Sequence, residues 1–217
     1  MTRMTTWAVM VCLALPTAAT AGTRFVPLPR ADGEASALEL RVVRYTGGVS
    51  GKMIVDVRNV GSEPEGFSAT GLYFVPDKAA EQPPQREGAA GPFVARSGRR
   101  MTTVAVASRA TVRLHLQVFC LDYDRPSPTS RTSFKLAGRR LPGQLAALIE
   151  TGAEAILRRQ AGRAGLATAA IQSHVWNVRK LHVVQLEGEQ PQQHRAPASR
   201  PVEAFVRPAP GNDVDWR

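Results

Sequence analysis

The sequence predicts an α+β protein in which an antiparallel β-sandwich of the immunoglobulin type is followed by two helices and a disordered C-terminal tail. Three observations lead to this prediction. Apolar and polar residues alternate between residues 38 and 122, which is typical of strands with one wet face. After Pro142 the apolar spacing becomes that of helices. From Glu187 onward apolar periodicity almost vanishes, so residues 187–217 are expected to be disordered.

Residues 1–21 have the order of a secretory signal peptide. Arg3 gives a positive start, residues 7–15 are an unbroken apolar run, and small residues lead to a cleavage site after Ala21. The run is about nine residues long, whereas a membrane-spanning helix needs roughly twenty. We therefore expect a secreted protein, periplasmic or extracellular, without a membrane span. Cys12 leaves with the signal, so no lipid anchor is expected.

The chain is strongly basic, with a formal net charge of +10 over 217 residues. Its arginines are scattered and aromatic residues are few, which disfavours nucleic-acid binding. An exported basic protein more often meets an extracellular protein or an anionic polysaccharide. Arginine greatly outnumbers lysine and alanine is abundant, which is typical of a GC-rich bacterial genome.

The predicted sandwich occupies residues 37–122, after an N-terminal linker at 22–36. Its first two strands form a hairpin through the glycine turn that follows Tyr45. The expected strands, at least five in number and antiparallel, are 38–42, 53–57, 69–75, 102–106 and 111–121.

A long segment rich in proline, glycine, glutamine and charge runs from residue 77 to residue 98. Loops of this length are usually functional or mobile. The segment is either an adaptable contact surface or only a solvated connection. In the first case the contacting residues are Gln82, Gln85, Arg86 and Phe93.

Residues 123–186 are expected to form a loop and a helical segment that packs on the sandwich. A rigid polar loop with Pro126 and Pro128 comes first, and Pro142 stands where a helix begins. Gly162 and Gly165 are expected to end that helix. A second helix is expected over 166–181, with an apolar side formed by Ile171, Val175, Val178 and Leu181.

The mature chain has one cysteine, Cys120, in a compartment that favours disulfides. By the alternation of its strand, Cys120 continues the inward face of Leu114, Leu116 and Val118. Three interpretations remain open. The thiol is a small apolar core group, it forms a disulfide with another chain, or it is chemically reactive.

The reactive interpretation comes from two short motifs. Phe119-Cys120-Leu121-Asp122 ends a predicted strand, and Ala169-Ala170-Ile171-Gln172-Ser173-His174-Val175-Trp176 lies in the second predicted helix. Together they resemble the thioester domains of bacterial surface adhesins, over about residues 118–178.

In that family a cysteine sulfur and a glutamine carboxamide condense, with loss of ammonia, into a thioester that bonds covalently to amines. The resemblance implies a bond between Cys120 and Gln172, with Asp122, His174 and Trp176 as supporting residues. This sequence has Ile171 where the family has threonine, and His174 where it has alanine. The implied function is adhesion without catalysis.

Other chemistry has less support in the sequence. A cysteine hydrolase built from Cys120, His174 and Asp122 is a distant alternative, and no Gly-X-Ser-X-Gly motif occurs. The histidines are spread along the chain without metal-ligand spacing. We expect no metal, no cofactor and no enzymatic activity. The alternative to a thioester protein is a plain secreted sandwich module with a buried cysteine.

Overall fold

A computed structural model provides the structure of the chain, and it describes part of the sequence. The described residues are 24–30, 36–48, 51–78, 81–89, 93–94, 100–101, 103–182 and 184–187. The described residues form one compact unit that ends at Glu187. The predicted signal peptide and almost all of the predicted disordered tail therefore lie outside the described residues.

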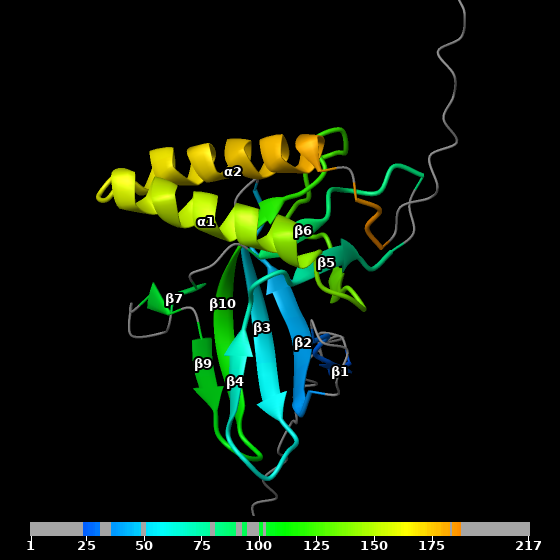
Figure 1. Cartoon of the computed structure of the whole chain (residues 1–217). Helices are drawn as coiled ribbons and strands as arrows, with labels where there is room; N and C mark the ends of the chain where they lie inside the picture. Colours follow the sequence, from blue (N-terminus) through cyan, green and yellow to red (C-terminus); the bar gives the residue numbers. More distant parts are fainter. Residues whose placement is uncertain are drawn as a thin grey trace, which may run out of the picture. The chain divides into compact units, whose positions relative to one another are not determined.

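The fold is mixed α+β, with a mostly antiparallel sheet and two helices (Figure 1). The strands are β1 (Val26–Pro27), β2 (Leu38–Tyr45), β3 (Lys52–Asn59), β4 (Glu65–Ser68), β5 (Tyr73–Pro76), β6 (Glu87–Ala89), β7 (Phe93–Val94), β8 (Arg100–Met101), β9 (Thr103–Val106), β10 (Thr111–Cys120) and β11 (Phe134–Leu136). The predicted hairpin is confirmed, because β2 and β3 pair antiparallel.

The strand order of the large sheet is β1-β2-β3-β10-β6-β5-β11, and β7 and β8 attach to it beside β10. The sheet nearly closes on itself: Phe134 of β11 packs edge-on against Tyr45 of β2, with ring centroids 5.3 Å apart. A second sheet contains β4 and β9. The fold is thus not clearly an immunoglobulin sandwich, because one curled sheet carries most of the described strands.

The first hydrophobic core lies inside the curved sheet. Alternate residues of β2 and β10 point into it, as the period of two requires, and the small sheet adds Phe67 and Val106. Each fully buried large apolar side chain of this kind contributes roughly 1.5–3 kcal/mol. The residues that β2 and β10 supply are Leu38, Leu40, Val42, Leu114, Leu116 and Val118.

The two helices are α1 (Gly143–Arg159) and α2 (Ala164–Leu181), which lie side by side in Figure 1. The helix expected after Pro142 is confirmed. Gly165, expected with Gly162 to end the first helix, instead lies in the first turn of α2. Neither described helix is long and apolar enough to cross a membrane.

A second core joins these helices to one end of the sheet. Its sheet residues come from β5 and from the end of β10, on the face opposite the first core. The helices contribute residues spaced three or four apart, which share one side of a helix. The main contributors are Tyr73, Val75, Phe119, Leu121, Leu145, Ile149, Ile171, Val175 and Val178.

Three predicted boundaries are corrected by long-range strand pairing. The expected linker 22–36 contains β1, which pairs with β2. The expected loop 77–98 contains β6 and β7, which both pair with β10. The helical segment 123–186 also supplies β11, which pairs with β5. These short strands have too few residues to show an alternation, so their partners decide their conformation.

Candidate functional site

The site forms where β10 extends beyond its neighbour β3. The ladder between them runs from Thr111 opposite Arg58 to Gln117 opposite Lys52, and the Val118 N–H then donates to the Gly51 carbonyl at 3.2 Å. The next residue whose N–H and C=O face this edge is Cys120. Because β3 has ended, these two groups need another partner.

Gln172 of α2 supplies that partner. Its Oε1 accepts the Cys120 N–H at 3.0 Å, and its Nε2 donates to the Cys120 carbonyl at 2.8 Å. The carboxamide thus replaces a strand residue and ties α2 to the sheet. Gln172 is 3 % exposed and Cys120 is fully buried, so water does not compete for these hydrogen bonds. Cys120 and Gln172, separated by 52 positions in the sequence, are therefore in contact.

The Cys120 thiol has a different neighbour, on the opposite edge of β10. Cys120 lies opposite Glu87 in the ladder with β6, and its Sγ donates to Glu87 Oε1 at 3.1 Å. Burial, and then the charge and hydrogen bond of Glu87, raise the pKa of the Cys120 thiol well above its usual value. The thiol is protonated at neutral pH, and it becomes nucleophilic only when a base removes that proton.

Glu87 is itself in an unusual environment. The residue is fully buried, and burial raises the pKa of its carboxyl from an ordinary 4.5 to about 8. Tyr45 of β2 lies next to it, and its hydroxyl donates to the Gly48 carbonyl. Gly51 makes room for this ring, since a Cβ there would lie 2.4 Å from a ring carbon of Tyr45.

Asp122 belongs to a separate ion pair. Its carboxylate accepts hydrogen bonds from the Arg86 main chain at 3.0 Å and from Arg86 Nε at 2.7 Å, and a second guanidinium nitrogen reaches its other oxygen. Burial alone would raise the pKa of Asp122, but the hydrogen bonds and charge of Arg86 outweigh it and lower that pKa. The pair is buried on both sides, so each charge depends on the other.

The other predicted supporting residues lie on α2. His174 is partly buried, and its Nε2 lies 3.1 Å from the Leu148 carbonyl of α1. Trp176 is partly buried, and its Nε1 has no hydrogen-bond partner among the described residues. Cys120, His174 and Asp122 thus contact three different groups, so they do not form the hydrolase arrangement considered from the sequence.

The predicted contact residues of the 77–98 segment do not share one surface. Gln85 and Arg86 are 3 % and 1 % exposed, which corrects the expectation that they form an adaptable patch. Gln82 is exposed. Phe93 lies in β7, and its side chain is outside the described part of the structure.

Sequence reasoning missed Glu87 and Tyr45. Glu87 follows a run of proline and glutamine and precedes Gly88, a context that normally indicates a solvated loop. Tyr45 ends a predicted strand next to a glycine turn. No local signal marks either residue, because only the pairing of β6 with β10 buries Glu87 beside the thiol.

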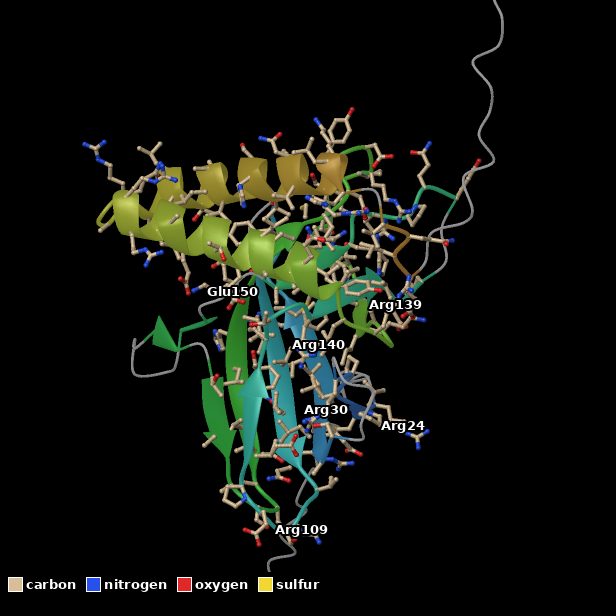
Figure 2. All side chains as sticks on the ribbon, in the orientation of Figure 1. Arg24, Arg30, Arg109, Arg139, Arg140 and Glu150 are labelled. Carbon is tan, nitrogen blue, oxygen red and sulfur yellow. The ribbon has the colours of Figure 1, made fainter. Side chains whose placement is uncertain are left out.

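A second feature is a depression of about 530 Å³ beside β4, with Arg30 and Arg140 in its lining. Figure 2 labels both arginines. Arg140 donates to the carbonyls of Pro29, Ser68 and Thr70 and makes no ion pair with a described carboxylate. Burial, and then the charge of Arg30, lower the pKa of Arg140. Glu65 also lines the depression and pairs with Arg30 at 3.5 Å, so two guanidinium groups face one carboxylate there and the balance is cationic. No group of three metal-ligating residues occurs in the described ranges.

Comparison with known proteins adds no assignment. No family model matches the chain, no curated protein matches it, and no solved structure matches it.

Proposed function

We propose that the chain is an exported, non-catalytic surface-interaction protein in which Cys120 and Gln172 close into an internal thioester. The thioester then transfers the Gln172 acyl group to an amine on a neighbouring surface. Export is supported by the signal-like order of residues 1–21. The covalent step is supported by the resemblance of the two motifs and by the contact of the two residues.

One observation carries the proposal: the Cys120 N–H lies 3.0 Å from Gln172 Oε1. An amide carbon becomes open to attack when a donor stabilises the negative charge that develops on its oxygen. The main-chain N–H of the attacking residue is such a donor, and the burial of both residues keeps water from hydrolysing the product.

The proposed partner is an extracellular protein or an anionic polysaccharide that bears amines. Its attraction to the chain rests on the net charge of +10 and on the cationic depression with Arg30 and Arg140. We also propose that the β-rich half is an immunoglobulin-like sandwich, since β4 and β9 cover the same core as the large sheet.

A plain exported module without covalent chemistry is the second candidate. It is favoured by the hydrogen bond that Sγ donates to Glu87, because this bond engages the thiol with a group other than Gln172. In this case Gln172 is a structural lock that satisfies two buried main-chain groups.

Intact mass spectrometry of the mature protein separates the two candidates. A thioester lowers the mass by one ammonia, and methylamine then adds to Gln172. Cys120→Ser is the matched control, since it keeps the size and the main chain but removes the sulfur. It should show neither change. An unchanged mass, with a thiol that reacts with iodoacetamide in denaturant, would falsify the covalent proposal and leave the plain module.

A further inference from the structure

Glu87 is a buried carboxyl group next to the Cys120 thiol. It is 0 % exposed. The Tyr45 hydroxyl lies within reach of the carboxyl and moderates its pKa, but Oε2 makes no hydrogen bond of ordinary geometry among the described residues. Burying an acid without a cation is costly. Its chain neighbour Arg86 does not help, because the Arg86 guanidinium binds Asp122. A group kept in such a place calls for a chemical explanation.

The contacts of Glu87 point to the thiol. Its Oε1 accepts the hydrogen bond from Cys120 Sγ at 3.1 Å, within the range expected of a group that takes a proton directly. Burial holds the pKa of Glu87 at about 8, so the carboxyl gains and loses a proton near neutral pH. Tyr45 and Phe134 pack together beside this cluster and help to exclude water from it.

The two partners of Cys120 lie on opposite edges of one strand. The main chain of Cys120 meets Gln172 on the edge that β3 has left, while the thiol meets Glu87 on the edge that pairs with β6. The staggered positions of Sγ about the Cα–Cβ bond include one between the main-chain N and C atoms. That position faces the Gln172 edge, so closure requires Sγ to turn from the Glu87 edge to the Gln172 edge.

We propose that Glu87 is the proton acceptor and proton donor for closure of the Cys120–Gln172 thioester. This inference rests on the proposed function. The Glu87 carboxylate takes the proton of Sγ, and the thiolate attacks Gln172 Cδ. The negative charge moves to Oε1, where the Cys120 N–H stabilises it. The C–N bond then breaks, and the nitrogen leaves as ammonia with the proton that Glu87 returns. Thiol and amide become thioester and ammonia, and Glu87 ends as it began.

Aminolysis by methylamine is the reverse of closure with a different amine, so it needs the same proton transfer in the opposite direction. The experiment therefore measures the rate of methylamine addition to the full mature chain by intact mass, over a range of pH at constant free-base methylamine. For the wild type we expect the rate to rise as Glu87 ionises, because the reverse of closure begins with the carboxylate, which takes a proton from the attacking amine and then gives it to the departing sulfur.

Glu87→Gln is the decisive variant, since glutamine keeps the shape and a hydrogen bond but transfers no proton. We expect aminolysis about a hundredfold slower, without the pH dependence of the wild type. Glu87→Asp should restore part of the rate. The control is Glu150→Gln on α1, a residue labelled in Figure 2. Its carboxylate accepts a hydrogen bond from the Thr70 hydroxyl at 3.1 Å, and the variant should react like the wild type.

The outcomes distinguish the two proposals. A wild type that never loses ammonia overturns both the thioester and the role of Glu87. A wild type that loses ammonia, with Glu87→Gln reacting at the same rate and with the same pH profile, overturns only the role of Glu87. A flat wild-type profile overturns it as well, and this measurement does not depend on whether any variant folds.

Discussion

Glu87 shows how a single residue can occupy an environment opposed to its own chemistry. An isolated carboxyl prefers water, yet Glu87 is fully buried beside a thiol that is also held protonated. In the ion pair of Asp122 and Arg86, by contrast, a cation compensates for the same loss of water. The pKa values of the two acids are therefore shifted in opposite directions: that of Glu87 is raised and that of Asp122 is lowered.

The raised pKa of Glu87 predicts a pH-dependent stability. In the unfolded chain the carboxyl ionises near 4.5, whereas in the folded protein it does so near 8. The folded state therefore binds one more proton between these values, so its stability is highest below 4.5 and declines as pH rises toward 8. The slope from this group is about 1.4 kcal/mol per pH unit.

Urea unfolding at several pH values measures this slope, and Glu87→Gln isolates it. The variant lacks the ionising group, so it should be increasingly more stable than the wild type as pH rises. A constant difference between the two proteins across that range would show that Glu87 ionises normally and is not in the environment described.

At the scale of elements, the position of helix α2 depends on gaps in the neighbouring elements as well as on its own apolar side. Gln172 fills the gap beyond β3, and His174 reaches the Leu148 carbonyl because Gly152 of α1 leaves space for its ring. A Cβ on Gly152 would lie 1.9 Å from His174 Nε2. The helix pair therefore depends on a glycine that helix propensity alone disfavours.

Two glycine substitutions test this packing. Gly165, in the first turn of α2, has no neighbouring atom within 4 Å of an added Cβ, so Gly165→Ala should raise the free energy of unfolding by up to about 1 kcal/mol. Gly152→Ala should lack this gain, because His174 must leave the Leu148 carbonyl. Denaturant unfolding of both variants measures the difference. Equal gains would contradict the proposed fit of His174 against Gly152.

At the scale of the whole molecule, the compact unit ends with a short clamp. Leu186 is 2 % exposed, and three groups of Glu187 bind distant parts of the unit. Its N–H donates to the Tyr73 hydroxyl at 3.2 Å, its Oε2 accepts the Gly138 N–H at 2.6 Å, and its carbonyl accepts from Arg86 at 3.3 Å. Residues after α2 thus contribute to the fold.

Truncation tests this boundary. A chain that ends at Glu187 should keep the thermal stability of the mature protein. A chain that ends at His182 should lose at least about 2 kcal/mol, because it loses the burial of Leu186 together with the clamp. Circular dichroism during heating measures both. Equal melting temperatures for the two truncated chains would show that the clamp contributes nothing.

The sequence by itself determined the strands and helices that are long enough to show a repeating pattern of apolar residues. The strands from Leu38, Lys52 and Thr111 and the helix after Pro142 were predictable, because alternation and helical spacing are local properties. Short motifs also selected Cys120 and Gln172, which do lie in contact.

Only the tertiary structure decided the rest. The short strands β1, β6 and β11 exist because partners pair with them, and the near-closure of the sheet follows from those pairings. The direction of the Cys120 thiol toward Glu87 was likewise beyond the sequence. The physical reason is that burial of a polar residue depends on which distant segments cover it, and no pattern of neighbouring residues encodes that.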